Sequence, residues 1–361
     1  MTAQPVTAQP VTAQRVTTSR PGRSPDVEPF LAGCAWRAVA GVPYPRFDPR
    51  DASRIPADTW LCAQIPAGVR LELVGDASAI TLDYVTATDD LGYRGPGAGT
   101  TFALWRAGEQ VDEQPALLGA GTVTLSLGSA RGQVPAVVYL PEGMRPEVLA
   151  IRAVGGSIEP APRGPRWVAY GDSLLEGWVA SAPALAWGAL AARRHGLDLV
   201  NLGYAGSARG EIPCAEAVAG LPADVISISH GTNCWTRTPH SAGMMLETTR
   251  AFLDIVRQGH PDTPMVVASP VLRPDAETTP NRLGATLADL RAAMEEVVQA
   301  RIDAGDDALV LIPGAAVITA EHLADGIHPG DEGQARLAEV FGAAIAAAVR
   351  PGAAGHPGHG D

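Results

Sequence analysis

The stretch Arg166–Leu174, RWVAYGDSL, decides the fold of the second half of the chain. It begins with a short apolar run that predicts a buried strand, and the run stops at Gly171 before a helix-like segment. A serine at such a strand-to-helix turn lies on a tight, exposed backbone near the N–H groups that open the helix, which favour negative charge. That position suits a nucleophile whose reaction generates an oxyanion. Alternatively, Asp172 or Ser173 only caps the helix, and this stretch does not decide between the two.

Strand-like runs alternate with helical ones beyond this stretch. Such alternation predicts a parallel sheet with helices on both faces, a three-layer α/β/α domain of flavodoxin-like type. In these sheets ligands bind beyond the carboxyl ends of the strands, so residues that follow a strand are candidates for a site. The expected strands are 167–170, 198–202, 225–229, 265–269 and 308–312, and the expected helices are 183–195, 242–260, 283–304 and 332–349.

Residues 29–157 carry short strand signals instead. Alternating apolar residues, broken by Gly, Pro and Asp and with no long helical period between them, predict an antiparallel β-sandwich of jelly-roll-like type. A proline-rich linker at 158–165 separates this sandwich from the α/β region at 166–350. The tryptophans of the predicted sandwich are interpreted as residues of core or interdomain packing rather than as sugar-stacking platforms. They are Trp36, Trp60 and Trp105.

Composition argues against several partners and sites. The chain has a net charge of −12 and no basic cluster, so neither nucleic acid nor an anionic membrane surface is an expected partner. The four cysteines form no C-x-x-C pair, which argues against a metal site, and pairing of Cys34 with Cys62 is left open. Without a secretory h-region or a membrane span we expect a cytoplasmic protein. A disordered segment is predicted at 1–28 and a flexible tail at 351–361.

Polar residues and glycines gather at the predicted strand ends. Asp172 and Ser173 follow the first strand, and GYAG at 203–206 follows the second. GTN at 231–233 follows the third strand, and DGIHP at 325–329 precedes the last helix. A hydroxyl, an imidazole, a carboxylate, a carboxamide and a glycine N–H are the parts needed for acyl transfer through a covalent serine ester.

These blocks resemble those of the SGNH, or GDSL, hydrolases. The family pattern is Gly-Asp-Ser-Leu, then a glycine after the second strand, Gly-x-Asn after the third, and Asp-x-x-His-Pro near the end; this chain has all four in order over about 166–350. The third block is often followed by Asp, and Cys234 stands there instead, which leaves the asparagine intact.

The resemblance implies a role for each matching residue. Ser173 would be the nucleophile, His328 the general base and acid, and Asp325 the residue that orients the imidazole. The backbone N–H groups of Ser173 and Gly203 and the side chain of Asn233 would form the oxyanion hole, with Gly206 taken as turn backbone.

Other polar and aromatic residues near the strand ends have competing interpretations. Asp172 is interpreted as a structural acid, and His230, the main rival imidazole, as a packing residue at a strand end. Trp178 and Trp235 leave strand ends near the predicted site, where they either wall an aromatic substrate pocket or serve packing. No bound cofactor or metal is implied.

The motifs define a serine ester intermediate but not its acceptor. Water as acceptor gives an esterase acting on small or carbohydrate esters, and a bound hydroxyl gives an acyltransferase. The whole chain resembles GDSL acyltransferases of polyketide tailoring, which implies an aromatic acyl-CoA donor and a small-molecule hydroxyl acceptor. A non-enzymatic carbohydrate-binding protein is the third hypothesis. We expect the β region to have a structural or pocket-shaping role.

Overall fold

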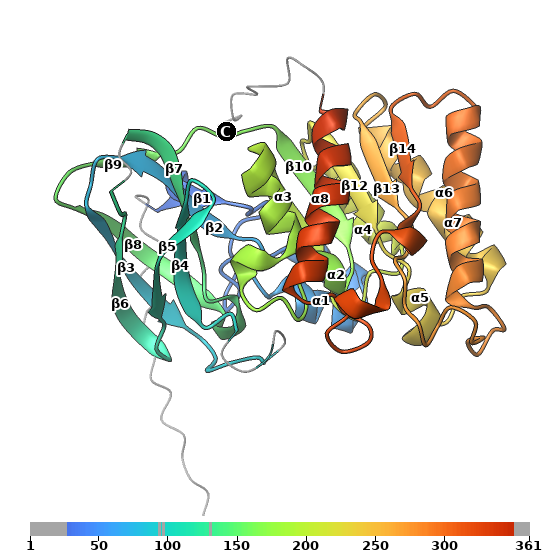
Figure 1. Ribbon diagram of the computed structural model, residues 1–361, viewed down its shortest axis with the longest axis horizontal. Coiled ribbons are helices and arrows are strands. Elements are labelled where there is room, and N and C mark those ends of the chain that lie inside the picture. The colour runs from blue at the N-terminus through green and yellow to red at the C-terminus, as the bar shows by residue number, and fades with distance from the viewer. Residues whose placement is uncertain (1–26, 93–94, 96–97, 130–131, 350–361) are drawn as a thin grey trace, which may run out of the picture.

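The structure is a computed structural model that describes residues 27–92, 95, 98–129 and 132–349. It contains a region of two antiparallel sheets and an α/β region, which lie side by side (Figure 1). The disorder predicted for 1–28, all but its last two residues, and the tail predicted for 351–361 lie outside the described residues. None of the described helices is long and apolar enough to span a bilayer.

The α/β region is built on five parallel strands in the order β11-β10-β12-β13-β14. In chain order this is 2-1-3-4-5, the flavodoxin-like arrangement, so the sheet order reverses at β10. Each strand agrees with its predicted range to within one residue at either end. The strands are β10 (Arg166–Gly171), β11 (Asp198–Gly203), β12 (Val225–Ser229), β13 (Met265–Ala268) and β14 (Leu309–Ile312).

Helices cover both faces of this sheet, as predicted (Figure 1). Side chains alternate along β10, so that Trp167 and Ala169 face one helical layer while Val168 and Tyr170 face the other. The first layer holds α3 (Trp187–His195) and α8 (Asp331–Ala348). The second holds α4 (Ile212–Gly220), α6 (Ala242–Gly259) and α7 (Leu287–Asp303).

Some helix boundaries differ from the predicted ones. Helix α7 starts at Leu287 rather than 283, because Thr286 and Asp289 form a reciprocal capping box that fixes its first turn. The helix predicted at 183–195 is divided into a 3-10 turn, η4 (Pro183–Leu185), and α3, whose first N–H, on Trp187, donates to Gln334 Oε1. The helix-like segment predicted after Gly171 is the short helix α2 (Ser173–Glu176), whereas helix α4 and the short helix α5 (Asn233–Thr236) were not predicted.

The N-terminal sheets share one apolar core. One sheet has the order β1-β2-β7-β4-β5 with β9 also on β2, and the other has the order β6-β3-β8; every described pair is antiparallel, as predicted. Strand β5 was missed because its sequence, EQVDEQP, is polar on both faces. The strands are β1 (Leu31–Ala32), β2 (Arg70–Gly75), β3 (Ala79–Thr86), β4 (Thr101–Arg106), β5 (Glu109–Pro115), β6 (Gly119–Ser126), β7 (Gly132–Tyr139), β8 (Pro146–Val154) and β9 (Ile158–Pro160).

Two segments depart from the predicted division of the chain. The first residues of the predicted linker form β9, in which Pro160 pairs with Leu73 of β2. Residues 47–63, predicted to lie in the sandwich, pack instead on the α/β core through side chains such as Phe47 and Ala63. They include η2 (Pro49–Arg54) and helix α1 (Ala57–Ala63).

The tryptophans and cysteines of the N-terminal part serve packing. Trp36 and Trp60 lie against the α/β core, and Trp105 lies at the junction, with the Arg193 guanidinium 4.4 Å from its ring centroid. Cys34 and Cys62 are both free, and their thiols donate to the carbonyls of Trp36 and Ala205 respectively.

Candidate active site

Ser173 lies on the turn that the sequence predicted. Strand β10 ends at Gly171, where a Cβ would come within 2.7 Å of the Ser229 carbonyl of β12, so a glycine is required. Asp172 is the N-cap of α2 and accepts a hydrogen bond of 3.0 Å from Leu174 N–H. Ser173 is the first helical residue. The two interpretations of this stretch are therefore compatible: the aspartate caps the helix, and the serine is free for another role.

A hydrogen-bonded relay joins Ser173 to His328 and Asp325, which share one loop about 150 positions later in the chain. His328 Nε2 is 3.0 Å from Ser173 Oγ, and His328 Nδ1 is 2.8 Å from Asp325 Oδ2. The carboxylate requires the proton on Nδ1, so Nε2 is left to accept the serine proton. This is the geometry of a Ser-His-Asp triad.

Asp325 is held as a carboxylate by its own loop. Its Oδ1 accepts from the backbone N–H groups of Ile327 and His328, at 2.9 and 2.7 Å. Burial alone would raise the pKa of Asp325. The hydrogen bonds from the His328 side chain and from these N–H groups together lower it by more than burial raises it, so the pKa lies below its ordinary value. The charged form is the one that stabilises a histidinium.

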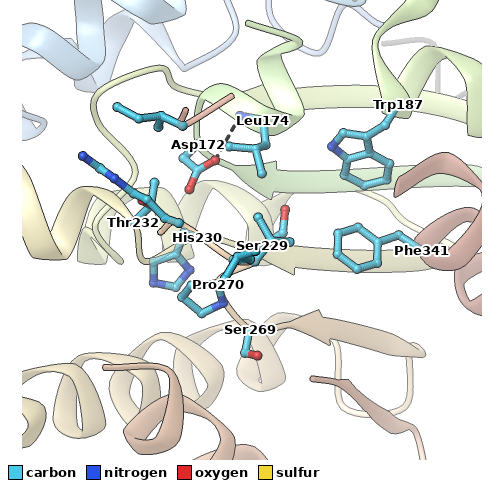
Figure 2. A pocket seen from close by; sticks show the side chains of 13 residues that line it. Asp172, Leu174, Trp187, Ser229, His230, Thr232, Ser269, Pro270 and Phe341 are labelled. Carbon is cyan, nitrogen blue, oxygen red and sulfur yellow. Dashed lines mark hydrogen bonds between the residues drawn. The ribbon is translucent and has the colours of Figure 1, made fainter. Parts of the chain in front are cut away.

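Asp172 and His230 have no such arrangement and lie on a small internal cavity of about 20 Å³ (Figure 2). Burial raises the pKa of Asp172 to about 7, against the lowering effect of the Leu174 hydrogen bond. Burial lowers the pKa of His230 to about 3; neither of its ring nitrogens has a hydrogen-bond partner within the described ranges, and its ring lies edge-on to Tyr170. The structural interpretation of both residues therefore holds.

The predicted role of Gly203 requires a correction. Strand β11 runs through Gly203, and its N–H donates to Asn201 Oδ1 at 2.8 Å, so this N–H is not available for an oxyanion. Gly203 is also not among the residues that line the cavity above Ser173, whereas Gly206 is. The sequence prediction ended the strand one residue early and so chose the first glycine of GYAG instead of the last.

Gly206 lies where an oxyanion donor is needed. Its φ of 67° places it in the left-handed region, where glycine is favoured. In the part of the chain that the structure describes, neither its N–H nor that of Ser173 has a hydrogen-bond partner. Asn233 Nδ2 donates one proton to the Ser207 carbonyl and has a second one left. The three donors follow β10, β11 and β12, the strands that meet where the sheet order reverses.

The N-terminal part supports this oxyanion loop, residues 203–210. Arg46 is buried and donates to the carbonyls of Gly203 and Cys62 and, at 3.4 Å, to Glu176 Oε2. The same Glu176 oxygen accepts from Ala205 N–H at 2.8 Å, one residue before Gly206. Thr59 Oγ1 shares a hydrogen bond with Ser207 Oγ, and Cys62 Sγ donates to the Ala205 carbonyl. No local pattern in the sequence pointed to these contacts.

An open cavity of about 260 Å³ lies above the nucleophile. Trp178 lines it, with its ring centroid 5.9 Å from that of His328, as the pocket prediction required. Trp235 does not line it: its Nε1 donates to the Thr279 carbonyl, and the Arg273 guanidinium lies 5.0 Å from its ring centroid. Trp235 is therefore a packing residue behind the wall. Over the described ranges, no group of three or more His, Cys, Asp or Glu side chains is placed to hold a metal ion.

Fold, relay and oxyanion donors together define a serine acylhydrolase of the SGNH type. The family model of the GDSL-like lipase/acylhydrolase family matches residues 165–346, half of the chain, and the chain belongs to this family. A search of curated protein sequences gives no match.

Solved structures resemble the chain over both of its regions. The salicylyl-acyltransferase SsfX3 from a tetracycline biosynthetic pathway is 25% identical, with a TM-score of 0.73, and the match covers 85% of this chain and 91% of that one. A family two carbohydrate esterase from Clostridium thermocellum is 15% identical, with a TM-score of 0.57, covering 77% and 90%. An acetyl xylan esterase from Butyrivibrio proteoclasticus is 16% identical, with a TM-score of 0.53, covering 77% and 88%. The two esterases share the fold.

Proposed function

We propose that this chain is a cytoplasmic O-acyltransferase that moves an aromatic acyl group, such as salicylyl, from a CoA thioester to a hydroxyl of a small molecule such as a polyketide. The observation that carries the proposal is the Asp325–His328–Ser173 relay, in a chain that resembles a salicylyl-acyltransferase over 85% of its length. This likeness extends over the sandwich as well as the α/β region, and the sandwich region supplies contacts to the oxyanion loop.

The first half-reaction forms the acyl-enzyme. Ser173 Oγ attacks the thioester carbonyl while His328 Nε2 takes its proton. The resulting oxyanion accepts from the N–H groups of Ser173 and Gly206 and from Asn233 Nδ2, donors worth about 2.7–4 kcal/mol each in comparable sites. The C–S bond then breaks, the proton on His328 passes to the departing thiolate, and an ester on Ser173 is left.

The second half-reaction transfers the acyl group. His328 takes the proton of the acceptor hydroxyl, whose oxygen attacks the Ser173 ester through the same oxyanion site. Breaking the Ser173 C–O bond returns the proton from His328 to Ser173 and releases the product ester. Trp178 and Ile327 give the cavity an apolar wall suited to an aromatic acyl group.

Hydrolysis of small or carbohydrate O-acyl esters is the alternative. It is favoured by the openness of the site: the Asp325 side chain is 43% exposed, and the cavity opens to solvent, so that water can reach a Ser173 ester.

Incubation with an acyl-CoA, with and without candidate acceptors, tests the proposal. Thiol release and product mass are followed together. An acyltransferase gives acyl-acceptor mass and releases thiol faster when the acceptor is present. If thiol release is equally fast without acceptor and no acyl-acceptor mass forms, the transferase proposal is wrong and the esterase alternative stands.

A further inference from the structure

We propose that Arg237 binds an anionic group of the substrate beside the oxyanion site and so determines which esters the enzyme accepts. This inference rests on the proposed acyl chemistry at Ser173, because both concern the same cavity. It adds a property of the substrate, a negative charge, that neither the triad nor the family likeness specifies.

The charge of the cavity is opposite to that of the chain. The chain carries a net charge of −12, yet Arg237 and Arg273 both line the cavity above Ser173. Within the described part of the chain, no aspartate or glutamate lines it. A cavity of one sign with low-dielectric walls concentrates ligands of the opposite sign.

Arg273 is already neutralised. Its Nε and Nη2 donate to the two carboxylate oxygens of Asp275, at 2.9 and 3.1 Å. Its guanidinium also lies against the Trp235 ring, and Nη1 is 3.4 Å from Thr232 Oγ1. These contacts fix Arg273 as part of the cavity wall. Of the two arginines, Arg237 is therefore the one whose positive charge is available to a ligand.

Arg237 has no comparable partner. It is exposed, and its side chain makes no ion pair or hydrogen bond with the residues that the structure describes. Its guanidinium lies over the oxyanion loop: a Cβ on Gly206 would be 3.5 Å from both Cζ and Nη2 of Arg237. A guanidinium beside Gly206 that has no partner among the described residues is placed to bind an anion of a substrate whose carbonyl lies at Ser173.

The ligand chemistry is a carboxylate or a phosphate, which a guanidinium fork binds with two N–H donors. Such an anion belongs either to the acyl group or to the nucleotide part of a CoA thioester. The rest of the cavity wall is mainly apolar, with Trp178 and Ile327, so the substrate joins this charge to an apolar body.

Two pairs of probes separate these sources. The first pair places the charge on the acyl group: para-nitrophenyl hydrogen succinate against its uncharged isostere para-nitrophenyl isocaproate. The second pair places it on the leaving group: acetyl-CoA against the acetyl thioester of N-acetylcysteamine. For each pair kcat/KM is measured in the parent enzyme, in Arg237→Gln, in Arg237→Lys and in Arg250→Gln. Arg250 is an exposed arginine of α6 whose guanidinium pairs with Glu247, and its replacement removes the same charge away from the cavity.

We expect the parent enzyme and Arg250→Gln to prefer the charged member of at least one pair by about tenfold or more, as for a charge-assisted hydrogen bond. Arg237→Gln should bring that ratio close to one through slower turnover of the charged ester alone, and Arg237→Lys should restore part of it. The pair that responds identifies the source of the charge. If Arg237→Gln leaves both ratios unchanged, the inference is wrong. If the ratio is unchanged because charged and neutral esters lose activity equally, that result would assign Arg237 to the oxyanion itself.

Binding of the same probes to Ser173→Ala, with and without Arg237→Gln, separates this inference from the proposed function. Calorimetric affinities do not require turnover. If no ester is turned over by the parent enzyme, the proposed function fails, but the affinity ratio of charged to neutral probe still decides the role of Arg237. A ratio of about tenfold that Arg237→Gln abolishes supports the proposed anion binding by Arg237. A ratio near one contradicts it.

Discussion

The loop that carries Asp325 and His328 and the loop that carries Gly206 complete the same site, but they are held in different ways. The first loop is held by its own backbone, since Asp325 accepts from the N–H groups of Ile327 and His328 and from the ring of His328. The second is held from outside, by Arg46, Thr59 and Cys62 of the N-terminal part.

This difference separates chemistry that is encoded locally from chemistry that depends on the tertiary fold. A D-x-x-H spacing fixes the acid and the base wherever the loop is placed. The oxyanion donors depend on where β11 ends and on contacts with residues about 150 positions earlier in the chain. We therefore expect changes in the first loop to affect catalysis alone, and changes behind the second to affect catalysis and stability together.

Replacing His328 gives the largest expected effect. His328→Ala should lower kcat by about four to six orders of magnitude, because both proton transfers are lost, while the melting temperature stays within a few degrees of the parent. Steady-state rates and thermal unfolding check this. A modest loss of activity would mean that another imidazole, with His230 as the first suspect, serves as the base.

Asn233→Ala comes next, because it removes one oxyanion donor. We expect kcat to fall by about 10²–10³ with little change in KM. The Ser207 carbonyl also loses the Asn233 donor, so the melting temperature should fall slightly. An effect on KM alone would place Asn233 in substrate binding rather than in transition-state stabilisation.

Arg46→Met tests the support of the oxyanion loop. Loss of the guanidinium removes one partner of the buried Arg46–Glu176 ion pair, and breaking such a pair costs about 3–5 kcal/mol of the free energy of unfolding. Activity should fall as well, since Glu176 also holds Ala205 N–H. Adding Glu176→Gln should recover part of the stability, because the uncompensated charge is removed.

Arg193→Met is the matched control for Arg46→Met. Arg193 also joins the two regions, through Trp105 and the Tyr139 hydroxyl, but it touches no part of the oxyanion loop. Its replacement should lower the free energy of unfolding and leave kcat unchanged. Equal losses of kcat in both variants would show that any loosening of the junction reaches the site.

The last prediction concerns Asp172 and the dependence of stability on pH. The folded-state pKa, raised to about 7 from 3.8, means that the folded chain binds more protons than the unfolded chain between these values, so its stability falls as the pH rises across this window. Asp172→Asn can still cap α2 but cannot ionise. The free energy of unfolding of Asp172→Asn relative to that of the parent should therefore increase by up to about 4 kcal/mol between about pH 4 and about pH 7. Above about pH 7 the difference should stay constant. Urea unfolding at several pH values measures this difference, and a constant one would contradict the assignment.

The same contrast explains how far the sequence could lead. Alternation in 166–350 predicted all five parallel strands, and the blocks placed Ser173, Asp325 and His328 correctly, because each signal is local. Gly206 was passed over because the end of β11 was placed one residue early. Arg46 and α1 were missed because their partners are distant in the chain and leave no periodic trace.

The central claim is that Ser173 carries the acyl group, and intact-protein mass spectrometry after incubation with an acyl-CoA or an activated ester tests it most directly. We predict a mass increase of one acyl group, located by fragmentation on the Ser173 peptide, and its absence from Ser173→Ala. An adduct of the same mass on Ser173→Ala, or one located on another residue of the parent enzyme, would contradict the account.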